Sequence, residues 1–160
     1  MDFTDPNDNV ARLDLKEGSF VAVFGSGAGG HSLAASRAMN HSGTIHAIDV
    51  RKEMLEVLDQ NAKLEGAHGL RTVHANIEDE GGTKIDTQSV DAVIIPNTLF
   101  SYEDRPGIMK EAHRILSPEG QVLIVEWRDS YGGMGPQEEN IVNEEAAKKL
   151  ATDAGFTIAE

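Results

Sequence analysis

The stretch SFVAVFGSGAGGHSLAAS, residues 19–36, decides the fold of this chain. It begins as an apolar run, breaks into glycines and continues as a helix-forming segment, a pattern typical of a strand, a loop and a helix. The glycines at positions 25, 27, 29 and 30 let the backbone approach a ligand without an intervening Cβ. The free N–H groups at the start of the following helix favour a carboxylate or a phosphate. The stretch therefore predicts a site for a nucleotide-like cofactor.

Composition limits the size and setting of the protein. With 160 residues, 39% of them apolar, we expect a single domain over residues 1–160, with a helical segment at 1–18 and a sheet core at 19–160. A net charge of −13 argues against a nucleic-acid partner. The absence of cysteine excludes disulfides and thiolate metal sites. Short apolar runs and an N-terminus unlike a signal peptide predict a cytoplasmic protein with no membrane partner.

Strand and helix patterns alternate along the chain. Each predicted strand is a short apolar or β-branched run, and each predicted helix carries apolar residues at helical spacing or a capping signal. We predict strands at 20–24, 44–50, 70–77, 90–95, 121–127 and 156–159, and helices at 5–13, 30–39, 51–64, 104–116 and 143–154. This alternation predicts an α/β fold, a doubly wound, mainly parallel open sheet with helices on both faces. Ligands of such sheets bind beyond the carboxyl ends of the strands.

Motifs at that edge of the predicted sheet resemble those of a known family. They are the glycine loop, Asp49 at the end of the second strand, Asn76 and Ile77 after the third, Asn97 after the fourth, and the turn LSPEG at 116–120 before the fifth. Together they resemble class I S-adenosylmethionine-dependent methyltransferases, most closely the small bacterial and archaeal branch related to ubiquinone and menaquinone methyltransferases. The resemblance covers nearly the whole chain, and its most distinctive part is the LSPEG turn.

The resemblance implies an S-adenosylmethionine-dependent methyltransferase that acts on a small-molecule acceptor. Backbone amides at 25–27 suit the methionine moiety, and Asp49 suits the ribose diol, because a carboxylate can accept both hydroxyl hydrogens. By the resemblance, adenine lies between Val50 and Ile77, with Asn76 facing its amino group and Met54 closing the apolar slot. The predicted cofactor-binding residues are Gly25, Ser26, Gly27, Gly29, Asp49, Val50, Met54, Asn76 and Ile77.

Three features depart from the family pattern. Val23 stands where the family usually has an acidic residue, which predicts weaker cofactor binding, and Asn76 stands where an aspartate is common. No segment follows 156–159 that would form the family's antiparallel seventh strand. Because an uncovered strand edge presents unpaired backbone groups, we expect the chain either to be less stable than a longer form or to form a homo-oligomer through the 156–159 edge.

The predicted catalytic residues follow from position alone. Methyl transfer from a sulfonium needs mainly alignment and the exclusion of water, and it needs a base only where the acceptor loses a proton. Asn97 and Asp129, beyond the ends of two strands, are the predicted catalytic residues, and Glu103 and His31 are further candidates for a base. The histidines show no ligand-like spacing, so no metal site is predicted.

Two other functions fit part of the pattern. Gly25, Gly27 and Gly30 also satisfy the G-x-G-x-x-G motif of NAD- or FAD-binding oxidoreductases, in which Asp49 would hold the adenosine ribose. Against this stand the LSPEG turn and the lack of a downstream domain with a hydride-relay residue. A non-catalytic S-adenosylmethionine-binding or interaction module would fit Val23 and the absent last strand. A thermal-shift comparison of NAD with S-adenosylmethionine distinguishes an oxidoreductase from a methyltransferase. An activity screen of a longer form distinguishes a non-catalytic module from a methyltransferase.

Overall fold

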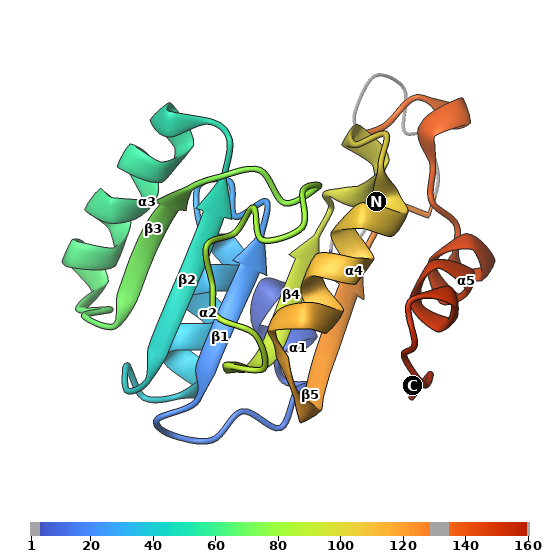
Figure 1. Cartoon of the computed structure of the whole chain (residues 1–160). Helices are drawn as coiled ribbons and strands as arrows, with labels where there is room; N and C mark the ends of the chain where they lie inside the picture. Colours follow the sequence, from blue (N-terminus) through green and yellow to red (C-terminus); the bar gives the residue numbers. More distant parts are fainter. Residues whose placement is uncertain (1–3, 129–134, 160) are drawn as a thin grey trace.

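A five-stranded parallel sheet forms the centre of the computed structural model, which describes residues 4–128 and 135–159. The strands lie in the order β3-β2-β1-β4-β5, and every neighbouring pair is parallel (Figure 1). Their bounds are β1 (Phe20–Phe24), β2 (Thr44–Asp49), β3 (Leu70–His74), β4 (Val90–Pro96) and β5 (Leu116–Val125). The predicted open α/β sheet is confirmed, and no seventh strand is present among the described residues.

Helices cover both faces of the sheet. α1 (Pro6–Val10), α2 (Gly30–Ala38) and α3 (Lys52–Glu65) pack on one face, and α4 (Arg105–Ile115) and α5 (Glu144–Asp153) pack on the other (Figure 1). Side chains of Asp5, Asp104 and Asn143 accept backbone N–H groups at the starts of α1, α4 and α5. These caps satisfy donors that a helix cannot pair internally, so they fix where the three helices begin.

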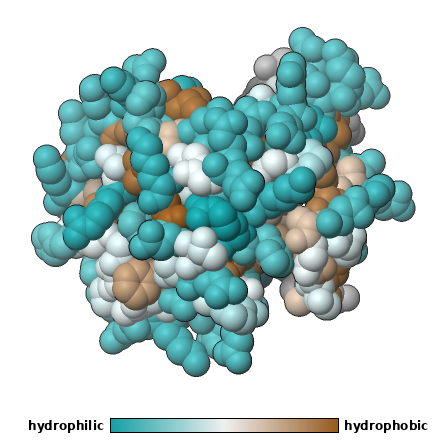
Figure 2. Space-filling model, in the orientation of Figure 1, coloured by the Kyte–Doolittle hydropathy of each residue, from teal (hydrophilic) through white to brown (hydrophobic). Residues whose placement is uncertain are grey.

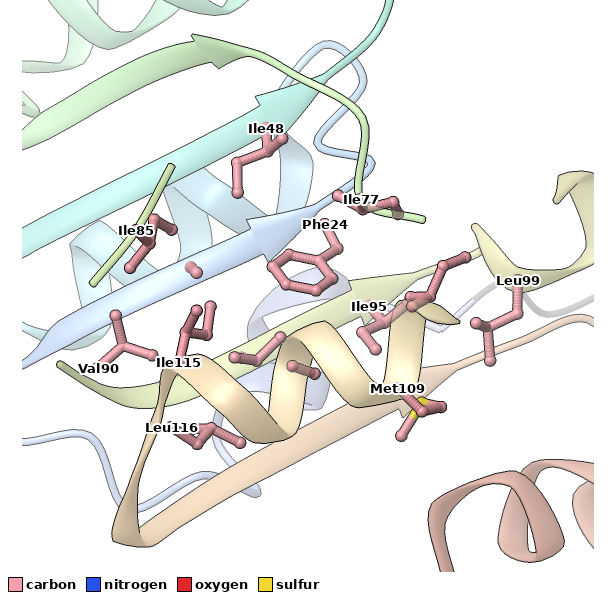
Figure 3. Packing of buried hydrophobic residues seen from close by; sticks show 14 of the residues in the cluster. Phe24, Ile48, Ile77, Ile85, Val90, Ile95, Leu99, Met109, Ile115 and Leu116 are labelled. Atoms are coloured by element: carbon pink, nitrogen blue, oxygen red, sulfur yellow. The ribbon is translucent and has the colours of Figure 1, made fainter. Parts of the chain in front are cut away.

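The core consists of apolar clusters on the two faces of the sheet. Side chains alternate along β1, so that Phe24 packs with α4 while Val23 packs on the face of α1 and α2. Figure 3 shows Phe24 between the sheet and α4, with Ile77 and Ile95 close by. Val23 is fully buried, at 0% exposure, so the position where the resemblance leads one to expect an acid belongs to the core of this chain.

The strand predicted at 156–159 does not form. Helix α5 ends in a Schellman motif, in which Gly155 has a left-handed φ of +99° and the N–H of Phe156 donates to the Ala151 carbonyl at 3.0 Å. The ring of Phe156 meets His113 of α4 edge-on, with 5.1 Å between the ring centroids. Phe156 therefore closes the end of α5 against α4, and the sheet has five strands among the described residues instead of the six predicted.

The predicted LSPEG turn lies inside β5, and β5 begins directly after α4. Val90 pairs with Leu116 and Ala92 pairs with Gln121, so the residues between Leu116 and Gln121 bulge from a ladder that continues on both sides. A Cβ at Gly120 would lie 2.7 Å from the Leu116 side chain and 3.0 Å from the Ser117 carbonyl oxygen. Glycine is therefore the residue that fits at this point of the bulge.

The outer edge of β5 is the open edge on that side of the sheet, in place of the predicted 156–159 edge. Within the described ranges β5 pairs with β4 alone. Since an open strand edge can pair with a second chain, we expect the apparent mass of the protein to rise with its concentration. Light scattering over a concentration series measures this. A monomer mass at every concentration would contradict the prediction.

The surface is mainly hydrophilic. Figure 2 shows hydrophilic residues over most of one face, with hydrophobic residues in small separate areas. None of the helices in the described ranges is both long enough and apolar enough to cross a membrane. Because small separate apolar areas are normal on a protein surface, the functional site is to be sought in a cleft.

Candidate functional site

A cleft of about 540 Å³ opens where β1, β2 and β4 end. This is the point at which the strand order reverses, since β1 lies between β2 and β4. Its size falls within the range of about 300–1,000 Å³ that is usual for small-molecule sites. The lining residues are Gly25, Ser26, Gly27, His31, Asp49, Val50, Arg51, Pro96, Asn97, Thr98, Phe100, Ser101 and Tyr102.

The glycine loop is tied to β2 by its own backbone. The N–H groups of Gly25 and Ser26 donate to the Ile48 carbonyl at 2.8 and 2.9 Å, and the N–H of Gly27 donates to Asp49 Oδ2 at 2.9 Å. These amides therefore already have acceptors in this structure, and their contact with the methionine moiety stays a prediction. The Ser26 hydroxyl differs, because it is buried and has no hydrogen-bond partner among the described residues. It is a polar group of the loop that remains for a ligand.

Asp49 is the buried charge of the cleft. Only 3% exposed, it accepts the backbone N–H and Nε of Arg51 at Oδ1, at 2.9 and 3.0 Å. Its Oδ2 accepts Arg51 Nη2 at 3.0 Å in addition to the Gly27 N–H. Burial acts to raise the pKa of this carboxyl, but the hydrogen bonds from Arg51 and Gly27 outweigh it and hold the pKa below its ordinary value. Asp49 is therefore a carboxylate at neutral pH.

Gly25 occupies the point where two strand ends meet. Its φ is +74°, and a Cβ at this position would overlap the hydroxyl of Thr98. That hydroxyl lies 3.0 Å from the Phe24 carbonyl and 2.7 Å from the Pro96 carbonyl, so it joins the ends of β1 and β4. This junction can close because residue 25 has no side chain.

Glu126 holds the short 3-10 helix η1 (Leu99–Ser101) that follows β4. Its Oε1 accepts the N–H groups of Thr98 and Leu99 at 3.1 and 2.7 Å. Its Oε2 is buried without a partner in the described part of the chain, and burial raises the pKa of this carboxyl. Glu126 thereby positions the segment that carries Phe100 and Ser101 into the cleft lining.

His31 and Tyr102 are the other titratable residues of the cleft lining. Asn9 Nδ2 donates to His31 Nε2 at 3.1 Å, so the neutral ring carries its proton on Nδ1. Burial lowers the pKa of His31. Burial first, and then the charge of Asp49, raises the pKa of Tyr102. Both side chains are neutral at pH 7, which leaves Asp49 and Arg51 as the charged pair of the cleft.

A second cavity, of about 740 Å³, adjoins the cleft. The two share Phe100, Ser101 and Tyr102 in their linings. Arg105 joins the two segments that form it, because its guanidinium donates to the carbonyls of Leu99 and Phe100 in η1 and of Asn140 at 2.8, 3.3 and 3.2 Å. A ligand in this cavity would therefore lie next to one in the cleft.

Five of the predicted cofactor residues come together in the cleft, namely Gly25, Ser26, Gly27, Asp49 and Val50. The other four do not line it. Ile77 is buried in the core, Met54 is half-buried on α3, and a Cβ on Gly29 would overlap Leu58. The side chain of Asn76 is exposed, and its Oδ1 accepts the N–H of Glu78 at 2.9 Å. The adenine contacts assigned to this second group stay predictions.

The predicted catalytic residues separate in the structure. Asn97 lines the cleft with a left-handed φ of 49°, and Asp129 lies outside the described residues. Of the two further base candidates, His31 lines the cleft and Glu103 lines the second cavity. No group of three or more His, Asp or Glu side chains within residues 4–128 and 135–159 is arranged to hold a metal ion.

Phe100 and Tyr102 follow the fourth predicted strand, where the resemblance implies acceptor contacts, and both line the cleft. Four other lining residues were not predicted from the sequence, namely Arg51, Pro96, Thr98 and Ser101. The sequence did contain a sign of Arg51. It is the N-cap residue of α3, where a cation is unfavourable, and it stands two positions after the acid that ends β2. Nothing in the sequence indicated Thr98, because its contact with β1 forms only when β4 lies beside β1.

Comparison with known proteins bears on what this cleft binds. The family model described as a methyltransferase domain matches residues 22–124. The demethylmenaquinone methyltransferase of Lactobacillus johnsonii is 28% identical over 115 residues, which make up 72% of this chain and 46% of that protein. The arsenite methyltransferase of Aquipseudomonas alcaligenes is 27% identical over 114 residues, 69% of this chain and 33% of that protein. This chain thus spans about half the length, or less, of these curated relatives.

The fold has counterparts among solved structures. The crystal structure of an S-adenosylmethionine-dependent methyltransferase from Aquifex aeolicus matches with a TM-score of 0.85 at 22% identity. The match covers 98% of this chain and 81% of that one. At this level of identity, the likeness establishes the shared fold and leaves the activity to be argued from the site.

Proposed function

The chain belongs to the methyltransferase domain family, as a class I S-adenosylmethionine-dependent member, and on this basis we propose that it transfers a methyl group from S-adenosylmethionine to a small-molecule acceptor. The observation that carries the proposal is Asp49, a buried carboxylate in the cleft at the reversal of strand order. The two hydroxyl groups of a ribose diol can both donate to such a carboxylate. Neither the family nor these relatives support the NAD or FAD oxidoreductase alternative.

The residues of the cleft fit S-adenosylmethionine. Asp49 would hold the ribose, and the unpartnered hydroxyl of Ser26 would bind the amino-acid end of the cofactor. Val50, which is 45% exposed at the cleft, would give an apolar contact beside the adenine. The absence of a side chain at Gly27 leaves room next to the Asp49 oxygen that its N–H contacts.

The cofactor supplies an electrophilic methyl group on a sulfonium sulfur, and its transfer to a nucleophile leaves S-adenosylhomocysteine. The residues of this chain bind and align the two reactants, which is the main requirement of an in-line displacement. Phe100 and Tyr102 stand between the cleft and the second cavity and can exclude water from the junction. His31 Nε2 is already engaged by Asn9, so it is poorly placed to act as a base.

We assign the acceptor to the second cavity, since it adjoins the cleft and shares three lining residues with it. The two curated relatives are named for different acceptors, demethylmenaquinone and arsenite, so the acceptor is proposed as a small molecule only. Roles for Asn97 and Asp129 in its reaction stay predictions. It also stays a prediction that the chain is a single domain, that it is cytoplasmic and that it has no nucleic-acid partner.

S-adenosylmethionine and S-adenosylhomocysteine are expected to stabilise the protein, and NAD is not. A ligand at 100 times its Kd adds about 2.7 kcal/mol, which corresponds to a rise in Tm of about 5–10 °C for a chain of this size. We expect a modest affinity, since Val23 is apolar and Arg51 already occupies Asp49. Thermal unfolding with each ligand measures the effect. A rise with NAD and none with S-adenosylhomocysteine would refute the proposed function.

A further inference from the structure

The hydrogen-bonding capacity of Asp49 is full. An ionised carboxylate offers about four lone-pair positions, two on each oxygen. Oδ1 accepts from the backbone N–H and Nε of Arg51 at 2.9 and 3.0 Å, and Oδ2 accepts from Gly27 N–H and Arg51 Nη2 at 2.9 and 3.0 Å. A ribose diol needs two of these positions. The side chain of Arg51 holds two, and the backbone holds the other two.

We propose that the Arg51 side chain competes with the cofactor for Asp49, and that its guanidinium must leave both carboxylate oxygens before the ribose diol binds there. The inference rests on the proposed function, because it takes the ribose of S-adenosylmethionine as the incoming group. Arg51 thereby sets the affinity of the cofactor site.

The side chains of Arg51 and Asp49 differ in solvent exposure, and this difference allows the ribose diol to replace the guanidinium. The side chain of Arg51 is 58% exposed, whereas that of Asp49 is 3% exposed. The guanidinium can therefore swing into solvent while the carboxylate stays in place. The backbone N–H groups of Gly27 and Arg51 each keep one carboxylate oxygen oriented after the guanidinium has left. Asp49 is thus presented to the diol in the geometry already seen in the free protein.

Apart from its ion pair with Asp49, Arg51 brings no structural benefit at its position. It is the N-cap residue of α3, it makes no side-chain cap bond, and its positive charge lies at the helix end that disfavours cations. Serine is a preferred N-cap residue. Arg51→Ser therefore gains a cap while it loses the ion pair with Asp49. The backbone N–H groups of Gly27 and Arg51 still bond that carboxylate, so we expect the variant to fold, and its titration belongs well below its Tm.

The test is a calorimetric titration of S-adenosylhomocysteine into the wild type, Arg51→Ser and Arg51→Lys. We expect Arg51→Ser to bind about two- to fivefold more tightly, the range for removing one partly exposed competing ion pair. Arg51→Lys should lie between the two, because an ammonium cannot hold both carboxylate oxygens as a guanidinium does. Arg37→Ala is the matched control, since it removes the same charge and breaks a similar arginine–carboxylate pair, with Glu65, outside the cleft.

A pair of ligands locates the competition at the diol. Arg51→Ser should tighten the binding of adenosine and leave that of 2′,3′-dideoxyadenosine unchanged. Equal or weaker binding of S-adenosylhomocysteine by Arg51→Ser, with normal binding by the wild type, would overturn the competition and leave the proposed function standing. Equal gains with both nucleosides would overturn it as well. Failure of the wild type and every variant to bind S-adenosylhomocysteine would instead refute the proposed function and the competition with it.

Discussion

Replacing Asp49 with alanine is expected to weaken the binding of S-adenosylhomocysteine about 100-fold. The substitution removes both acceptors of the ribose diol, and hydrogen bonds to a charged group contribute about 1.5–3 kcal/mol each. A total loss of about 3 kcal/mol corresponds to about two powers of ten in Kd. Calorimetric titration of the wild type and Asp49→Ala measures the change.

The same substitution also lowers stability, in contrast to what a strand-end acid suggests from the sequence alone. Asp49 is 3% exposed and accepts the N–H groups of Gly27 and Arg51, which alanine leaves without their acceptor. The cost is about 1–3 kcal/mol, so the titration belongs well below the Tm of the variant. Asp59→Ala is the control, since Asp59 is an acid on α3 that bonds Thr72 outside the cleft. Equal affinities for Asp49→Ala and this control would contradict the assignment of the ribose site.

Local sequence signals located most elements of this fold. The apolar run at 20–24 became β1, and the caps at Asp5, Asp104 and Asn143 mark real helix starts. The failures came where tertiary contacts decide between two local options. Residues 156–159 are apolar enough for a strand, but Gly155 allows a Schellman motif, and Phe156 then packs on His113. The pattern of a short apolar run does not indicate whether it pairs in the sheet or packs against a helix.

The candidate site was only partly readable for a similar reason. Parallel strands place their carboxyl ends at one edge, so Gly25, Asp49 and Asn97 were correctly expected near one another. Which atoms remain free at that edge depends on bonds that form only in the folded chain. The amides at 25–27 donate to the Ile48 carbonyl and to Asp49, and the Arg51 side chain donates to Asp49 as well. Neither contact leaves a pattern in the sequence beyond an arginine at an unfavourable helix position.

A second buried carboxylate, Glu111 of α4, organises the loop between β3 and β4. It is 0% exposed, and its oxygens accept from Gly81 N–H, from the N–H and hydroxyl of Thr83, and from Arg114 Nε and Nη2, at 2.7–3.1 Å. Arg114 also donates to the Ile85 carbonyl at 2.8 Å. Burial acts to raise the pKa of Glu111, but the hydrogen bonds, led by those from Arg114 and Thr83, lower it from 4.5 to about 2.

Glu111→Ala is expected to lower the free energy of unfolding by about 3–5 kcal/mol, the range for breaking a buried ion pair by removing one partner. The lowered pKa agrees, because a change from 4.5 to about 2 corresponds to about 3 kcal/mol. The Tm should fall by about 6–20 °C. Urea unfolding and thermal unfolding at pH 7 measure the two quantities.

The pH dependence separates the charge of Glu111 from its packing. A carboxyl whose pKa is lower in the folded state stabilises the protein fully above its unfolded pKa, and this contribution is lost as pH falls from about 4.5 through about 2. The difference in stability between wild type and Glu111→Ala should therefore be constant from pH 7 to about 5 and shrink below it. Glu144→Ala, which breaks an exposed pair with Lys148, is the control and should stay close to wild type. If the difference is equally large at pH 7 and pH 3.5, packing of the Glu111 side chain, and not its ion pair with Arg114, holds this loop on α4.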